Sequence, residues 1–597
     1  MNKTKSLVSL LLILCLTTMA WAEDGSRLWL RTEIPENITL RIDYTMPNDD
    51  GYRINGKTVT ARTQMGLLYG KYALLRGEQG ESHPYFKLRI LNHWDNLDGT
   101  VERGYAGNSI FWPIHDNQLV RRYAEACASV GINGVVLNNV NASPKILTPI
   151  YLNKVKEIAE NLRPWGIHVY LSVNFGSPKA LGETETADPL NPKVQLWWKK
   201  KAKEIYKQIP DFGGFLVKAN SEGQPGPFDY GRTHVDGANM LADALKPYGG
   251  IVMWRSFVYG AKHHEEDRVK QAVSEFAELD GQFRDNVILQ SKNGPLDFQP
   301  REPYAPIFDK MKHTPQMVEL QITQEYLGQS KHLVYLAPMW EEFFTYVCPE
   351  RLAGIAGVAN IGLDTNWCGH HFSQANWYAF GRLAWNPFLS SEQIAKEWIL
   401  QTFGDWNTKL ENSSKLYTLN TQLISVMLRS REACVNYMMP LGLHHIFKFD
   451  HHMGPEPDGF KADYPIEWCP IYYHRANKDS IGVNRSSTGT NATSQYREPY
   501  RSIYDKTETC PEEYLLWFHR VPWEYRMKNG LTLWDEMQRL YNKGVAEVDD
   551  FAFIWQKLKP YIDEQRWQEV NELLLFQQED ARLWRDTCLK FFGSFIN

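Results

Sequence analysis

The segment GGFLVKANSEG (213–223) holds a short apolar run that ends in a polar loop. NVILQSKNGPLDF (286–298) and MVELQITQEYLG (317–328) repeat this pattern. Short apolar runs bounded by glycine or turn residues are typical of buried strands. Each of the three segments carries an acid just past its strand-like part: Glu222, Asp297 and Glu325. Acids on loops that follow parallel strands are where a β/α barrel builds its active site.

Five further strand-like runs lie around these three, and helical segments fall between several of them. The runs are FKLRILNHW (86–94), GINGVVLNNV (131–140), GIHVYLSVNFG (166–176), GGIVMWRSFVY (249–259) and GIAGVANIGL (354–363). The clearest helical segments are 119–131, 148–166, 191–209 and 235–249. Eight strands that alternate with helices are the count expected for a (β/α)8 TIM barrel, so we predict an α/β fold with this barrel at residues 81–375.

Smaller regions flank the predicted barrel. Residues 23–80 read as a small N-terminal α+β domain, with strands at RLWLRT (27–32) and NITLRIDYTM (37–46) and a helix at 63–77. Residues 376–597 read as a mainly α-helical C-terminal domain with a long aromatic loop at 442–500. The expected helices of this domain are 390–404, 510–526, 532–558 and 563–592.

The first 22 residues have the features of a secretory signal peptide. Lys3 and Lys5 precede an apolar stretch at 7–15, and Ala20-Trp21-Ala22 fits a cleavage site. The apolar stretch is too short for a membrane anchor, so we expect a secreted or periplasmic protein. Seven scattered cysteines remain and form no CxxC pair, which favours buried thiols with one or two bridges as the alternative.

Composition and motifs remove several classes of function. The 65 basic and 70 acidic residues nearly balance, which gives no sign of nucleic-acid binding. There is no GxxxxGK[ST] loop for a nucleotide, and no HExxH motif for a metal. The adjacent histidines at 370–371, 444–445 and 451–452 would point apart on regular elements. We therefore expect neither a metal nor another cofactor.

Three cations share the predicted strand ends with the acids: Lys218, Arg255 and Lys292. In one interpretation they only pair with the carboxylates and stabilise the barrel. In the other they bind an anionic substrate group by charge-assisted hydrogen bonds, which points to an acidic sugar. Lys218 alone would lower the pKa of Glu222, and a substrate carboxylate on the lysine would offset this effect. Trp94, at the end of the first strand, is a candidate platform for a sugar ring.

At these residues the sequence resembles glycoside hydrolase family 67, the α-glucuronidases that act on xylan-derived oligosaccharides. The segments that carry the resemblance are LNHWDNLDGTVERGYAG (91–107), VKANSEGQPGP (217–227), GGIVMWRS (249–256), SKNGPLDFQPREP (291–303), ITQEYLGQ (322–329) and YYHRANKDSIG (472–482). The stretch from Cys510 to about Phe592 is similar to the helical domain of that family. The N-terminal domain is shorter than is usual there.

The resemblance implies inverting hydrolysis that releases (4-O-methyl)glucuronic acid from an α-1,2 bond to a terminal xylose. It implies Glu222 as general acid and Asp297 and Glu325 as general bases. Lys218, Arg255 and Lys292 match positions that bind the uronic acid carboxylate, and Trp94 matches a sugar contact. The expected partners are glucuronoxylan-derived oligosaccharides and a second copy of the chain, bound through the C-terminal domain.

Two other functions stay open at this stage. A retaining or substrate-assisted glycosidase, such as a hexosaminidase, would need a carboxyl pair only about 5–5.5 Å apart, and an inverting enzyme about 6.5–9.5 Å. That alternative leaves the three cations unexplained. A non-catalytic glycan-binding protein would bind sugar without turnover, although all three acids are present.

Overall fold

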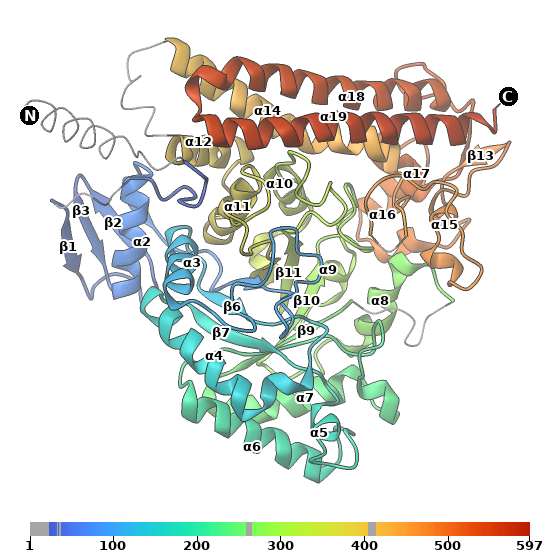
Figure 1. Ribbon diagram of the computed structural model, residues 1–597. Coiled ribbons are helices and arrows are strands. Elements are labelled where there is room, and N and C mark those ends of the chain that lie inside the picture. Colours follow the sequence, from blue (N-terminus) through green and yellow to red (C-terminus); the bar gives the residue numbers. More distant parts are fainter. Residues whose placement is uncertain are drawn as a thin grey trace, which may run out of the picture.

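The structure is a computed structural model that describes residues 23–32, 34, 37–257, 265–403, 414–449 and 451–596. The expected signal peptide at 1–22 and the ends of the predicted segments 249–259 and 390–404 lie outside these residues. A barrel forms the centre, a small sheet lies at one flank, and long C-terminal helices cross one side (Figure 1). None of the helices in the described part is both long enough and apolar enough to cross a membrane.

The centre is a closed barrel of eight parallel strands, which confirms the predicted (β/α)8 fold. The strands are β5 (Leu88–Asn92), β6 (Gly134–Val136), β7 (His168–Ser172), β8 (Gly214–Val217), β9 (Ile251–Arg255), β10 (Val287–Lys292), β11 (Gln316–Gln321) and β12 (Leu352–Val358). Neighbours in sequence pair side by side, and β12 closes the barrel on β5 with Gly354 opposite Leu88. All eight carboxyl ends therefore meet at one rim.

Helices around the barrel cover its strands on the outer face. Every residue of β10 and β11 is buried, as expected for parallel strands covered on both faces. The surrounding helices include α3 (Asn117–Ser129), α4 (Pro149–Leu162), α6 (Pro192–Gln208), α7 (His234–Leu245), α10 (Ala337–Tyr346) and α11 (Ser373–Trp385). Side chains of Asp116, Asn191 and Thr233 cap the first turns of α3, α6 and α7, which places each helix start just after a loop.

The N-terminal region is a four-stranded sheet with one helix packed on it. The strand order is β1 (Thr39–Ile42), β3 (Thr58–Ala61), β2 (Tyr52–Asn55) and β4 (Gly80–Ser82). Helix α2 (Gln64–Leu75) covers this sheet, and Thr63 caps its first turn. Trp385 of α11 stacks on Tyr52 with ring centroids 5.6 Å apart, so the sheet rests on the barrel through an aromatic contact.

The strand predicted at 27–32 is wrong, because these residues form successive turns. Leu28 adopts a left-handed backbone with a φ of 54°, which no strand residue adopts. The Trp29 ring packs edge-on against Trp377 of α11 at 5.1 Å, and its Nε1 donates to Ser129 Oγ. The alternating apolar side chains therefore anchor a turn in the barrel core and do not mark a strand.

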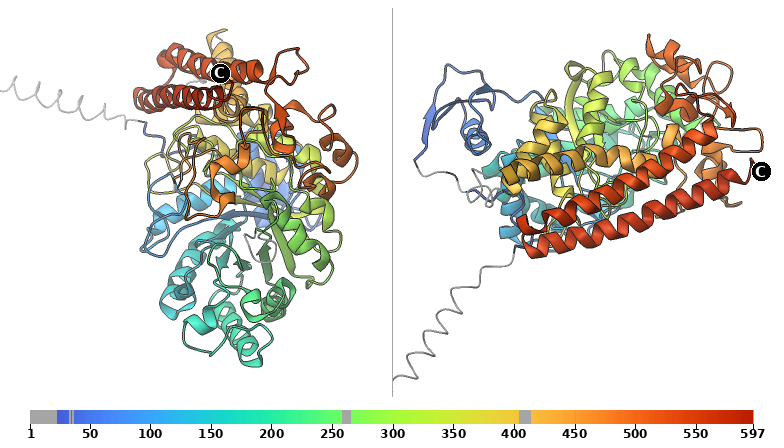
Figure 2. Two further views of the ribbon diagram at one scale, coloured as in Figure 1. Left: turned by 90° about the vertical axis from the view of Figure 1, so that its right-hand side faces the viewer. Right: turned by 90° about the horizontal axis from the view of Figure 1, so that it is seen from above.

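Long helices dominate the C-terminal region. They are α12 (Ser391–Thr402), α14 (Ser414–Met438), α18 (Leu533–Leu558) and α19 (Glu564–Gly593). The Ser390 side chain caps α12 by accepting from Gln393 N. Figure 2 shows α18 and α19 as two long neighbouring rods along one side of the barrel. The sequence did not predict α14, which packs against both of them.

The single helix predicted at 510–526 is also wrong. The chain makes a 3-10 turn at Glu512–Tyr514, a short α17 (Leu515–Phe518) and then the strand β14 (Val521–Pro522). Pro522 cannot continue a helix, and it lies within the part that becomes extended. The apolar residues 514–518 are all buried, so their spacing reflects a compact, irregular segment instead of one face of a helix.

Candidate active site

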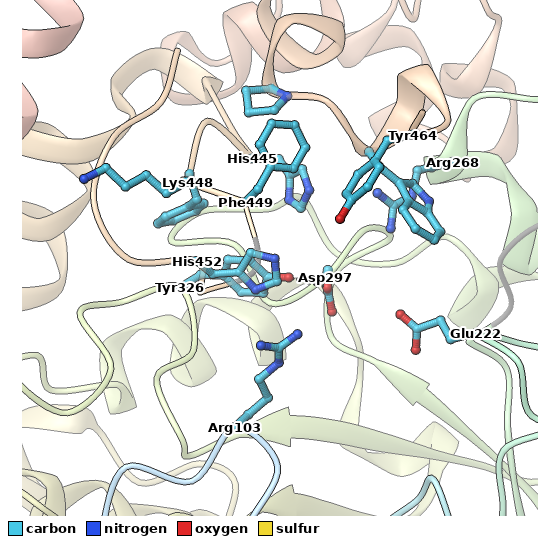
Figure 3. Close-up of a pocket in the computed structure, with 13 residues that line it drawn as sticks. Arg103, Glu222, Arg268, Asp297, Tyr326, His445, Lys448, Phe449, His452 and Tyr464 are labelled. Atoms are coloured by element: carbon cyan, nitrogen blue, oxygen red, sulfur yellow. Dashed lines mark hydrogen bonds between the residues drawn. The ribbon is translucent and has the colours of Figure 1, made fainter. Parts of the chain in front are cut away.

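A cavity of about 230 Å³ opens at the rim where the barrel strands end. Loops of the barrel form one side, and the C-terminal segments 445–449 and 452–470 form the other (Figure 3). The lining residues are Arg103, Glu222, Arg268, Asp297, Tyr326, His445, Phe447, Lys448, Phe449, His452, Tyr464, Trp468 and Pro470. Two of the three predicted acids thus face one cavity, and aromatic side chains of the C-terminal region cover it.

Glu222 lies on the loop after β8 with a left-handed backbone, φ 47°. Its Oε2 makes a short hydrogen bond with the ammonium of Lys218, the residue directly after β8. Burial acts to raise the pKa of Glu222, but the Lys218 charge outweighs it and leaves the pKa below its usual value. Without a substrate, Glu222 is therefore held as a carboxylate.

Lys218 is itself held from behind by an amide. Its Nζ donates to Asn141 Oδ1 at 2.9 Å, and the Asn141 amide donates to Glu102. Burial lowers the pKa of Lys218, and the Glu222 charge partly offsets this shift. The lysine is buried, with 3% of its surface exposed.

Asp297 follows β10 and lies at the centre of the cavity wall (Figure 3). Lys292 makes a short ion pair with Oδ1, and the Tyr326 hydroxyl donates to Oδ2. Burial acts to raise the pKa of Asp297, yet Lys292 and the Tyr326 bond hold it well below the usual range. The Lys292 ammonium also lies 3.2 Å from the centroid of the Phe257 ring.

Glu325 lies behind the wall formed by Arg103 and His452. Its Oε1 is 2.9 Å from Arg103 Nε and 2.9 Å from His452 Nδ1, and Gln321 donates to Oε2 at 2.9 Å. The residue is 4% exposed. Tyr326 follows it in the chain and bonds Asp297, so one short loop contacts both predicted bases.

Arg255 and Trp94 lie together at the ends of β9 and β5. The Arg255 guanidinium binds Glu319 of β11 in a two-pronged ion pair, with N–O distances of 2.9 and 2.5 Å. Its charge centre lies 5.6 Å from the centroid of the Trp94 ring. Both residues are buried. Burial acts to lower the pKa of Arg255, but the Glu319 ion pair outweighs it and raises the pKa, with smaller contributions from the charges of Glu222 and Asp297. The structure therefore gathers all seven predicted site residues around one rim of the barrel.

Comparison with known proteins identifies the chain. Residues 72–349 match the glycosyl hydrolase family 67 middle domain, and residues 368–597 match the glycosyl hydrolase family 67 C-terminus. The chain belongs to glycoside hydrolase family 67. It is thus a glycoside hydrolase of the α-glucuronidase family, as its sequence predicted.

Several relatives of this family 67 member carry the name alpha-glucuronidase A. The protein from Emericella nidulans is 39% identical, and the match covers 99% of this chain and 72% of that protein. The protein from Aspergillus tubingensis is 38% identical over 92% of this chain and 69% of its own length. A probable alpha-glucuronidase A from Neosartorya fischeri is 39% identical over 91% of this chain and 68% of its own.

Sequence reasoning missed the part of this family 67 site that comes from Arg103, Tyr326, His445 and His452. Tyr326 could have been found, because it directly follows a predicted acid. The histidines were weighed only as metal ligands, yet one member of each of two pairs lines the cavity. Among the residues that the structure describes, no group of three or more His, Cys, Asp or Glu is placed to hold a metal ion.

Proposed function

We propose that this protein hydrolyses the α-1,2 bond that joins (4-O-methyl)glucuronic acid to a terminal xylose of xylo-oligosaccharides, with inversion at the sugar. The observation that carries the proposal is the pair of lysine-bound acids, Glu222 and Asp297, on one cavity. A neutral sugar would leave the buried cations Lys218, Arg255 and Lys292 without a role in binding. A uronic acid brings the carboxylate that such cations bind.

Glu222 acts as the general acid and needs a proton before it can protonate the leaving xylose. In the free enzyme Lys218 lowers the pKa of Glu222. When the substrate carboxylate takes part of the Lys218 charge, the pKa of Glu222 rises and the acid can be protonated. Binding of the substrate would thus favour the protonated form of Glu222, and binding of a sugar without a carboxylate would not.

Asp297 and Glu325 activate the attacking water as general bases. Asp297 stays ionised because Lys292 and Tyr326 stabilise its charge. Glu325 has a cation, Arg103, 2.9 Å from its Oε1. Asp297 thus differs from Glu222 in that more than one partner holds it as a carboxylate, which suits a base.

The names of the relatives support the proposed substrate class, since each is called an alpha-glucuronidase. We extend the proposal to export through residues 1–22 and to a homodimer formed through the C-terminal domain. Exposed apolar side chains on α18 and α19 support the dimer: Phe553, Leu575 and Leu583 are 58%, 50% and 47% exposed. Sedimentation of wild type and Leu583→Glu would test it, with a dimer expected for the first and a monomer for the second.

Product analysis by NMR tests the reaction itself. Incubation with a defined aldouronic acid should release β-glucuronic acid first, before mutarotation gives the α form. First release of the α anomer would contradict inversion, and binding without any release would support a glycan-binding protein. The methyl ester of the same substrate should react at least about 100-fold more slowly if the lysines bind the carboxylate.

A further inference from the structure

The loop that carries Asp297 wraps around a second carboxylate, Glu302, to which neither the sequence nor the proposed reaction gives a role. Three backbone N–H groups donate to it: Leu296 N to Oε2 at 2.7 Å, and Asp297 N and Gln299 N to Oε1 at 2.8 Å each. Burial raises the pKa of Glu302 to about 7, and above that pH the charged carboxylate has room for all three, because each oxygen accepts up to two hydrogen bonds. The main chain of Asp297 is therefore fixed from behind while its side chain faces the cavity.

Gly294 shows how closely the loop fits this carboxylate. A Cβ at this position would lie 2.3 Å from Glu302 Oε2, so the backbone approaches closely only because the residue is glycine. Further along the loop, Phe298 adopts a left-handed backbone with a φ of 51°. An irregular loop of this kind lacks the regular backbone hydrogen bonds of a strand or helix. Glu302 supplies the acceptors for its N–H groups instead.

We propose that Glu302 is a positioning residue that holds the Asp297 carboxylate against Lys292 and Tyr326 through the backbone of residues 294–299. The proposal rests on the function proposed for Asp297. Glu302 touches no reacting atom in this arrangement and acts only through the loop. Displacement of a catalytic group by about 1 Å can reduce the rate about 100-fold, so a loop anchor at this place controls turnover.

The barrel carries a matched site at its opposite end. Asp280 precedes β10 and accepts from the backbone of Lys312, His313 and Thr314, with the closest contacts at 2.8, 3.0 and 2.8 Å. These residues precede β11, so they lie at the amino ends of the strands, away from the cavity. A change of Asp280 to Asn thus disturbs the same kind of loop anchor without reaching the site.

The experiment compares Glu302→Gln with Asp280→Asn in the full chain, on the aldouronic acid used above. In Glu302→Gln an amide N–H replaces one acceptor and faces a backbone N–H, so the loop loses at least one bond. We expect kcat to fall about 10- to 100-fold with KM changed less than about threefold. We also expect the acidic limb of the pH profile to move to higher pH, because Asp297 loses part of its stabilisation by Lys292 and Tyr326. Loss of the Glu302 charge alone would lower the pKa of Asp297 and move this limb to lower pH, so the direction of the shift distinguishes position from charge.

Asp280→Asn should keep the wild-type kcat and acidic limb even where it lowers Tm by a similar amount. Gly294→Ala serves as a second variant, because its Cβ displaces the Glu302 carboxylate while leaving the charge in place. It should reproduce the loss of kcat if Glu302→Gln does not fold. Wild-type kcat in a folded Glu302→Gln or in Gly294→Ala, or an equal loss in Asp280→Asn, would overturn the positioning role.

Asp297→Asn, measured in parallel, separates the two proposals. If it is inactive while Glu302→Gln behaves as wild type, the role of Asp297 stands and only the role of Glu302 fails. If Asp297→Asn keeps full activity, both fail, since there is no catalytic carboxylate to position.

Discussion

Two lysine–carboxylate pairs face the same cavity but are embedded differently. Lys218 and Glu222 flank the loop after β8, and Lys292 and Asp297 flank the loop after β10. The Glu222 side chain is 43% exposed, whereas that of Asp297 is 17% exposed. Asp297 also binds the Tyr326 hydroxyl, and its backbone is anchored by Glu302.

The difference shows how one kind of ion pair can serve two protonation states. A carboxylate that is buried and held by several donors keeps its charge over a wide pH range. A carboxylate at a half-open position beside one lysine changes its pKa as soon as that lysine gains another anion. The first arrangement suits the base and the second suits the acid.

The largest expected effect separates the roles of the two acids. Glu222→Gln and Asp297→Asn should each lower kcat on an aldouronic acid by about 10³-fold or more. With α-glucuronosyl fluoride, whose leaving group needs no proton, Glu222→Gln should regain about 100-fold and Asp297→Asn should not. Equal recovery of activity in both variants would contradict the assignment of Glu222 as the acid and Asp297 as the base.

The lysines should affect opposite limbs of the pH profile. The general acid works only when protonated, so Lys218→Met raises the pKa of Glu222 and moves the alkaline limb to higher pH. The base works only when ionised, so Lys292→Met raises the pKa of Asp297 and moves the acidic limb to higher pH. Profiles of kcat/KM for both variants would show the shifts, and movement of the same limb in both would contradict the comparison.

Removal of one hydroxyl should affect only the Asp297 side. Tyr326→Phe deletes the bond to Asp297 Oδ2, and we expect a roughly 5- to 50-fold fall in kcat with a smaller upward shift of the acidic limb. Tyr304→Phe is the control, since its hydroxyl binds Asp309 outside the cavity-lining set. A similar loss in both variants would show a general packing defect instead.

The smallest effect concerns stability at pH 7. Lys292→Met leaves a mostly buried carboxylate without its main counter-charge, so we expect the free energy of unfolding to fall by about 3 kcal/mol. Lys218→Met leaves Glu222 accessible to water, and the change should stay within about 1 kcal/mol. Urea unfolding monitored by tryptophan fluorescence would measure both, and equal losses would mean that exposure does not distinguish the pairs.

The barrel was predictable because the burial of its strands is visible in their sequences. The runs at 286–292 and 317–323 each hold a short apolar stretch followed by a turn signal, which is the pattern of a buried strand. The acids and lysines of the site lie at the ends of such runs, so the predicted strands also predicted their position at the rim. The strand predicted at 27–32 and the single helix predicted at 510–526 were wrong. The apolar spacing of both segments reflects tertiary packing instead of a regular secondary structure.

The partners of the acids could not be predicted in the same way. His452 reaches Glu325 from 127 residues further along the chain, and His445 contacts the loop of Asp297 through Gln299. No local period links such positions, since they meet only when the C-terminal region packs on the barrel. Arg255 was predicted to face a substrate, but its binding to Glu319, a buried strand residue, needed the register of β9, β10 and β11.

The far wall of the cavity begins only after α14 in the chain, whereas the acids and lysines precede it. The acids and lysines on one side, and the residues that cover the cavity on the other, are therefore encoded in separate stretches of the gene. A crossover within the codons of α14 would exchange one stretch between homologues and retain the other. Recombination would thus vary the residues that cover the cavity while both lysine–carboxylate pairs are inherited unchanged.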